Sequence, residues 1–211
     1  MIPAYNIYYV LLAQHNLAIF LDYSVNYLHF PLHDIWNRFL SSKICDKFMD
    51  ADPQVMAGRS GIELVFDVLG KEAINVPEYT SIDKSPEYWL GYYLAYFQWR
   101  VNLSFRQLEK YIKIEEILNM YHPYHEMDLE NFIIDLGKKY NERKGKTNLE
   151  IFRKELNMSR ADLSKQSNVP VRTIEHYEQR VVDINNASSK YIISLAKALY
   201  KKPEELLEIE I

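Results

Sequence analysis

Apolar residues recur at helical spacing along most of the chain. Residues 4–30 and 31–48 each carry an apolar face that repeats every three or four positions. A further helix is predicted after Ser60, where Glu63 completes a capping box, and another begins at Ser85-Pro86-Glu87. No stretch shows the alternation of a β-strand. The chain is therefore predicted to be all-α.

The helix predicted from Ser85 to Arg100 is aromatic around most of its circumference. Aromatic side chains are favoured at interfaces, so a partner or dimer surface is one interpretation of this helix. A place in the core of an N-terminal domain is the other, and the sequence leaves both open. The aromatic residues concerned are Tyr88, Trp89, Tyr92, Tyr93, Tyr96 and Trp99.

Two short helices joined by a tight turn are predicted between residues 159 and 180. Ser159 suits the N-cap of the first helix. Asn168 tolerates the left-handed conformation with which that helix has to end. In the second helix Ile174 and Tyr177 lie three positions apart, so both are expected to pack inward.

This segment resembles the helix-turn-helix of the λ-repressor/Cro (XRE) class, whose second helix lies in the major groove of DNA. The resemblance covers about residues 146–208. Residues 149–156 fit the first helix of that class, 188–200 the fourth and 203–207 the fifth. It implies a five-helix DNA-binding domain at this end of the chain, so the predicted architecture is an aromatic-rich helical domain followed by that domain.

The resemblance also implies a role for individual positions. Contacts to base edges are expected from Val171, Arg172, Glu175 and His176, and arginine is the side chain that reads guanine O6 and N7 together. Contacts to phosphate are expected from Arg160, Thr173, Gln179, Arg180 and Lys190. Arg153 and Glu178 match a buried ion pair that ties the first helix to the third.

The segment departs from the family pattern at three positions. Asn168 replaces the usual turn glycine, which is a mild change. Pro170 replaces a capping serine or threonine, and Arg180 stands where glycine commonly ends the recognition helix. The loop over residues 181–186 is therefore expected to follow a different path. A degenerate helix-turn-helix that contacts only protein is the alternative interpretation.

Composition and charge divide the chain. Residues 1–140 hold 14 of the 17 tyrosines and have 12 basic and 18 acidic residues, net −6, whereas residues 138–202 have 15 and 7, net +8. We predict a partner-binding or dimerisation domain over 1–137, a basic linker over 138–147 and a DNA-binding domain over 148–211. The overall charge of −4 argues against indiscriminate nucleic-acid binding, while the local excess attracts phosphate.

The remaining chemistry of the sequence is sparse. Cys45 is the only cysteine, no apolar run is long enough to cross a membrane, and a cytoplasmic protein is expected. His122, His125 and Asp128 crowd together with Glu126, but Pro123 prevents a helical metal-ligand pair. A loop with Asp128 capping the next helix is favoured over a metal site. No cofactor and no enzyme activity are expected, because no phosphate loop or catalytic triad order is present.

A second resemblance concerns the N-terminal region. The Gly-Arg-Ser-Gly segment at 58–61, the aromatic helix and residues 120–128 are similar to N-terminal regions of bacterial XRE-type regulators beside small toxin-like genes. This implies the antitoxin of a type II toxin–antitoxin pair, which binds its toxin through the N-terminal domain and represses its own operon. The alternative is a regulator that responds to a small apolar ligand and has no toxin partner.

One helix-turn-helix contacts too few bases for useful specificity. The protein is therefore expected to bind an inverted-repeat operator in double-stranded DNA as a homodimer.

Overall fold

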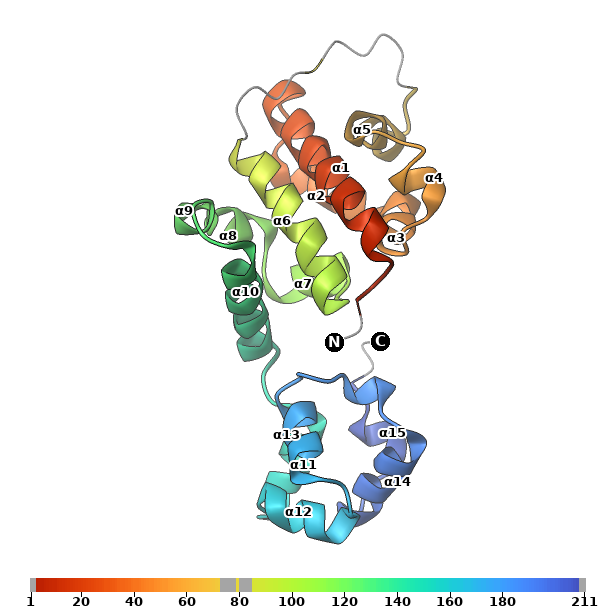
Figure 1. Ribbon diagram of the computed structural model, residues 1–211, viewed down its shortest axis with the longest axis vertical. Helices are drawn as coiled ribbons and strands as arrows, with labels where there is room; N and C mark the ends of the chain where they lie inside the picture. The colour runs from red at the N-terminus through yellow and green to blue at the C-terminus, as the bar shows by residue number, and fades with distance from the viewer. Residues whose placement is uncertain (1–2, 73–78, 80–84, 209–211) are drawn as a thin grey trace. The chain divides into compact units, whose positions relative to one another are not determined.

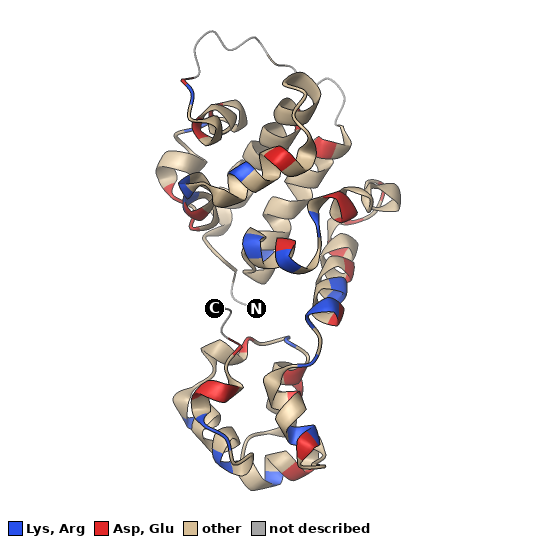
Figure 2. Cartoon of the chain, turned by 180° about the vertical axis from the view of Figure 1, so that it is seen from behind, with Lys and Arg blue, Asp and Glu red and all other residues tan. Residues whose placement is uncertain are grey.

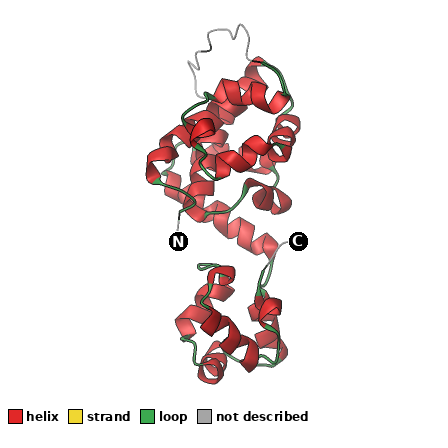
Figure 3. Ribbon diagram, turned by 90° about the vertical axis from the view of Figure 1, so that its right-hand side faces the viewer, coloured by secondary structure: helices red, strands yellow, loops and turns green. Residues whose placement is uncertain are grey.

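The computed structural model describes residues 3–72, 79 and 85–208. All regular elements in these residues are helices (Figure 3), which confirms the predicted all-α class. The chain divides into two compact units, Met1–Tyr140 (unit 1) and Asn141–Ile211 (unit 2). None of the described helices is long and apolar enough to cross a lipid bilayer.

The helices of unit 1 surround one apolar core (Figure 1). In chain order the described elements are η1 (Ile7–Tyr9), α1 (Val10–Asp22), the π-helix η2 (Tyr23–Tyr27), α2 (Leu32–Ser41), α3 (Lys43–Met49), α4 (Pro53–Met56), α5 (Gly61–Leu69), α6 (Pro86–Val101), α7 (Phe105–Tyr111), α8 (Ile114–Leu118), α9 (Tyr121–Tyr124) and α10 (Leu129–Lys144).

Local capping signals place most of the helix starts. Ser60 and Glu63 form the expected capping box of α5, and Ser85 caps α6 by accepting a hydrogen bond from the Tyr88 amide. The single helix expected over 31–48 is instead two. Ser42 ends α2 and caps α3 through the amide of Cys45, because a serine hydroxyl competes for backbone bonds inside a helical run.

The centre of unit 1 is the contact between α1 and α6, which lie side by side (Figure 1). Gly91 makes this contact possible. A Cβ atom there would lie 2.3 Å from the carbonyl oxygen of Leu17 and 2.6 Å from the Cα of Ala18. The two backbones therefore approach more closely than any residue with a side chain would allow.

The aromatic residues of α6 lie mainly inside unit 1. Tyr88, Trp89 and Trp99 are buried, while Tyr92, Tyr93 and Tyr96 are half-buried. The ring of Trp89 packs edge-on against Phe132 at 5.3 Å, and Trp99 Nε1 donates to the carbonyl of Tyr5 at 2.8 Å. This burial favours the core interpretation of the two that the sequence left open.

Unit 2 contains a second, smaller core. Its described elements are α11 (Asn148–Glu155), α12 (Arg160–Ser167), α13 (Val171–Glu178), η3 (Ile184–Asn186), α14 (Ser189–Ala198) and α15 (Pro203–Leu206). The core residues are Leu149, Leu163, Val169, Ile174, Tyr177, Ile184, Ile192, Leu195, Ala196, Leu199 and Leu206. Ile174 and Tyr177 pack inward, as expected from their spacing.

The segment between the two cores is largely helical. α10 continues to Lys144, so only residues 145–147 of the expected linker 138–147 lie outside the helix. Gly145 adopts a φ of 76°, which breaks the helix, and Thr147 then caps α11 by accepting from the amide of Glu150.

Candidate nucleic-acid interface

The turn between α12 and α13 is fixed by local hydrogen bonds. Asn168 ends α12 in the left-handed region, with φ 57°. The buried Ser167 hydroxyl donates to Leu163 O at 2.7 Å and accepts from the Val169 amide at 3.3 Å. Val169 itself is buried in the core of unit 2. The direction of α13 is therefore set by the turn as well as by the core.

The first turn of α12 is similarly ordered. Ser159 accepts from the amide of Asp162 at 3.1 Å, and the Asp162 carboxylate accepts from the amide of Ser159 at 2.9 Å. The hydrogen bonds from the Ser159 hydroxyl and amide hold the pKa of Asp162 below its ordinary value. This capping box places Arg160, the next residue, at the start of the helix.

The exposed face of α13 carries three of the four side chains expected to contact bases. Val171 exposes 43% of its surface, Arg172 is exposed, and His176 is half-exposed one turn further along. Arg172 forms no ion pair with the described part of the chain. Pro170 precedes the helix without any side-chain cap, and the amides of Thr173 and Ile174 donate to its carbonyl oxygen at 2.9 and 3.1 Å.

The fourth residue, Glu175, has its carboxylate occupied. Its Oε1 accepts from Arg160 Nη1 and from Gln179 Nε2, each at 3.3 Å. Glu175 thereby orients Arg160 and Gln179, both of which the sequence assigned to phosphate. Its contact to a base remains a prediction that this geometry does not favour.

A charge cluster joins the inward side of α13 to the two preceding helices. It consists of Glu178, Arg153 and Arg160, and we call it the Glu178 cluster. The Glu178 side chain is fully buried. It accepts from Arg153 Nε and Nη2 at 2.6 and 2.9 Å and from Arg160 Nε at 2.7 Å. Burial opposes ionisation of Glu178, but the hydrogen bonds from Arg153 and Arg160 outweigh it and hold its pKa below the ordinary value.

The cluster links α11, α12 and α13 through one carboxylate. Arg153 also donates from Nη1 to Met158 O at 2.6 Å, just before α12 begins. The sequence indicated Arg153 and Glu178 as a pair, but it did not indicate that Arg160 completes a triad. Arg160 remains about a third exposed, so its outer edge faces solvent beside α13.

Arg180 lies at the end of α13 and is turned into unit 2. Its guanidinium donates to both carboxylate oxygens of Glu208 at 2.8 and 3.1 Å and to Gly145 O at 2.6 Å. Its φ of 54° closes the helix in the position that glycine usually takes. A phosphate contact from Arg180 therefore stays a prediction that the structure does not favour, and no local signal in the sequence pointed to Glu208.

The other expected phosphate contacts keep the exposure that such a role requires. Thr173 is half-exposed, Gln179 is exposed, and Lys190 is exposed in the first turn of α14. Basic and acidic residues are interspersed over unit 2 (Figure 2). Residues 141–211 contain 13 basic and 11 acidic residues. The described part of unit 2 therefore does not present a uniformly basic surface.

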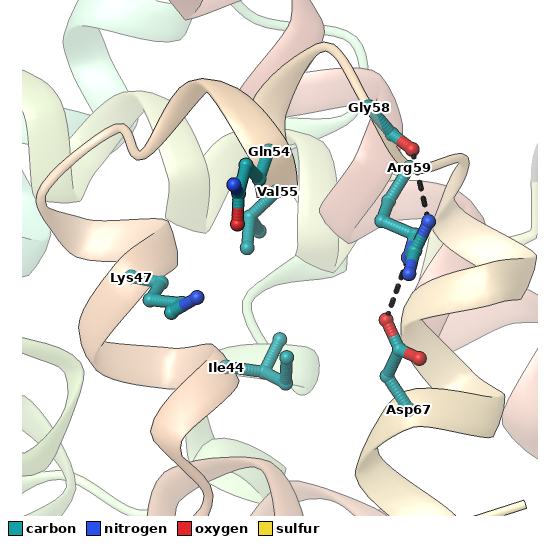
Figure 4. A pocket seen from close by; sticks show the side chains of 7 residues that line it. All are labelled: Ile44, Lys47, Gln54, Val55, Gly58, Arg59 and Asp67. Atoms are coloured by element: carbon teal, nitrogen blue, oxygen red, sulfur yellow. Dashed lines mark hydrogen bonds and ion pairs between the residues drawn. The ribbon is translucent and has the colours of Figure 1, made fainter.

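Unit 1 contains a pocket of about 310 Å³ between α3, α4 and α5 (Figure 4). Its cationic side chains face carboxylates, since Lys47 lies 3.7 Å from Asp52 and Arg59 donates to Asp67 at 2.9 Å. The described residues contain no group of three histidine, cysteine or acidic side chains placed to bind a metal ion. His125 instead stacks on Tyr121, with ring centroids 4.3 Å apart, and Asp128 accepts from the Glu130 amide.

Comparison with known proteins gives one match. Residues 149–206 match the family model described as helix-turn-helix, which spans α11 to α15. This confirms the resemblance to the XRE class that the sequence indicated. No protein of curated function and no solved structure matches the chain.

Proposed function

We propose that this chain, which carries an XRE-type helix-turn-helix domain in residues 149–206, is a sequence-specific transcriptional repressor that binds an inverted-repeat operator as a dimer. The observation that supports this most directly is the exposed face of α13. The side chains of Arg172 and Val171 are exposed on α13, and that of His176 is half-exposed. The last residue of this helix, Glu178, is held by hydrogen bonds from Arg153 and Arg160.

The geometry fits reading of the major groove. With α13 in the groove, Arg172 donates to guanine O6 and N7, and Val171 offers apolar contact to a thymine methyl. Arg160, Thr173, Gln179 and Lys190 contact phosphates on either side, which fixes the register of the helix without reading sequence. The Arg160–Glu175–Gln179 hydrogen bonds hold two of these phosphate ligands in place before DNA arrives.

Selection of binding sites from a pool of random-sequence DNA duplexes tests this proposal with the full chain. We expect an enriched inverted repeat, and Arg172→Ala is expected to lose about 1–3 kcal/mol and the preference at one base pair of each half-site. Lys165→Ala, a change of an exposed cation on α12, serves as the matched control and should keep that preference. Selection of no sequence by the parent chain would refute the proposal and favour a degenerate helix-turn-helix.

The identity of the partner is the finer part of the proposal. The resemblance of the N-terminal region supports an antitoxin, which binds a toxin through unit 1 and represses the shared operon. Co-expression of the full chain with the product of the neighbouring gene tests this. We expect a stoichiometric complex and loss of that product's toxicity; normal toxicity without a complex would leave an ordinary repressor.

A small-ligand-responsive regulator is the second candidate, and the pocket of Figure 4 is the feature that favours it. Its ion-paired lining suits a polar ligand better than the apolar one that the sequence suggested. A rise in the melting temperature of unit 1 with a polar metabolite, lost in Arg59→Ala, would support this candidate over the toxin partner.

A further inference from the structure

The first twenty or so residues carry no charged side chains. Residues 2–21 contain no aspartate, glutamate, lysine or arginine, although 26% of the whole chain is charged. The stretch includes η1 and nearly all of α1. Most of α1 is buried in the core of unit 1, which accounts for its uncharged residues. At η1 and the first turn of α1, however, uncharged side chains are exposed, where surface helices normally carry charged ones.

That face is apolar. Ile7 exposes 66% of its surface, Tyr8 85%, Leu11 57% and Leu12 42%. We name these four residues the N-terminal apolar face. Tyr8, Leu11 and Leu12 are spaced as i, i+3 and i+4, so they share one side of the first helical turns. Four such side chains make a patch on the order of a few hundred Å², the size at which exposed apolar surface is commonly functional.

Elsewhere in the described part of unit 1 exposed apolar residues are scattered. The other large ones that are strongly exposed are Tyr27 on η2, Met127 in the loop between α9 and α10, and Ile134 on α10. Single residues of this kind are normal on a protein surface. The clustering at the start of the chain is not.

Two polar side chains beside the face make hydrogen bonds within the chain. His15 Nδ1 lies 2.8 Å from Leu11 O, and its ring packs edge-on against Tyr92. Asn6 Oδ1 accepts from the Tyr8 amide at 3.1 Å. These two atoms therefore need no partner outside the chain.

The segment is also held in place. The Ala4 amide donates to Trp99 O at 2.9 Å, and Trp99 Nε1 donates to the carbonyl of Tyr5 at 2.8 Å. These bonds tie the chain before η1 to the end of α6. The face is thus presented on an anchored support, which lowers the entropy cost of covering it.

We propose that the N-terminal apolar face is the homodimer interface, in which the start of α1 packs against the same segment of a second copy. A charge-free surface requires a charge-free partner, because covering it with a charged surface would desolvate those charges without a counter-charge. A second copy supplies such a surface through two-fold symmetry. The inference rests on the proposed function, since reading of an inverted repeat is incomplete without a second α13.

The mass of the full chain in solution tests the interface without DNA. At micromolar concentrations the parent is expected to be a dimer and Leu11→Glu a monomer, with unchanged helical circular dichroism and tryptophan fluorescence. Ile134→Glu is the matched control, because Ile134 is equally exposed at 63% but lies on α10; it should remain dimeric. Where Leu11→Glu loses helix, Tyr8→Glu at the 85%-exposed position replaces it.

DNA binding then separates this inference from the proposed function. The monomeric variant is expected to bind a single selected half-site as the parent does, and to lose at least tenfold in affinity for the inverted repeat. The inference is overturned if the parent chain is a monomer, even where a different protein covers the N-terminal apolar face. It is also overturned if the Leu11→Glu variant remains a dimer. A dimer that Leu11→Glu dissociates but that selects no DNA sequence upholds the interface and refutes the proposed function.

Discussion

At the scale of single residues, the stability of unit 2 depends on the buried carboxylate of Glu178. Glu178→Gln leaves Arg153 buried without a counter-charge, so we expect a loss of about 3–5 kcal/mol in the unfolding free energy of unit 2. All three tryptophans lie in unit 1. Circular dichroism should therefore show an early loss of helix while the midpoint of tryptophan fluorescence stays unchanged.

The same carboxylate predicts a response to acid. Its pKa is lowered in the folded state, so its contribution is present above the unfolded pKa of about 4.3 and is lost as the pH falls through the folded value. Glu150→Gln is the control, since Glu150 pairs with an exposed lysine and should change stability by less than about 1 kcal/mol. If unit 2 had the same melting temperature in Glu178→Gln and Glu150→Gln, the Glu178 cluster would not have the stabilising role proposed for it.

At the scale of elements, the α1–α6 contact depends on the absence of a side chain at position 91. Gly91→Ala gains about 1 kcal/mol of helix propensity, but its Cβ meets the backbone of α1, which cannot move aside as a flexible side chain would. The steric cost should exceed the gain in helix propensity. We expect a net loss of about 1–3 kcal/mol in the unfolding free energy of unit 1, measured by tryptophan fluorescence.

A second glycine provides the opposite case. Gly137 lies within α10, and a Cβ atom there meets nothing within 4 Å. Gly137→Ala should therefore stabilise the protein by up to about 1 kcal/mol through helix propensity alone. The same substitution inside two helices is thus expected to lower the unfolding free energy at Gly91 and raise it at Gly137. If both changed the unfolding free energy in the same direction, the close approach of the backbones would not govern the α1–α6 contact.

The elements that the sequence predicted well are those with local signals. Ser60, Ser85 and Ser159 cap helices through bonds to residues three positions away, so their role is readable without the fold. Arg180 shows what is not readable. Its partner Glu208 is 28 residues away and belongs to no motif, so only the folded chain reveals that the guanidinium is already bound.

The environments of the aromatic helix and of the segment around η1 could not be predicted for a related reason. Both are rich in apolar residues, and helical periodicity cannot say which apolar face is covered by neighbours. In the fold the two tryptophans of α6 are buried, whereas η1 leaves Tyr8 exposed and the first turn of α1 leaves Leu11 exposed. Burial favours the core interpretation of α6, one of the two that the sequence left open, and we propose the homodimer interface at η1 and the start of α1.

At the scale of the whole molecule, a protein of net charge −4 binds a polyanion only through local charge. Lys190, exposed at the start of α14, belongs to the side chains proposed to contact phosphate. Lys43 is exposed at the start of α3 in unit 1 and is matched to it in charge. Changing either lysine to glutamine alters the net charge by the same amount, so the pair separates local from global electrostatics.

If binding is local, Lys190→Gln should weaken binding to all DNA sequences alike. It should also reduce the slope of log affinity against log salt by about 0.9 for each phosphate that the protein no longer neutralises. Lys43→Gln should leave that slope unchanged, because Lys43 is not among the side chains proposed to contact phosphate and a charge that makes no such contact is screened within about 10 Å at 0.1 M salt. Titration of the selected duplex over a range of salt concentrations measures both slopes. Equal reductions would mean that the whole molecule, rather than the surface beside α13, sets the affinity for DNA.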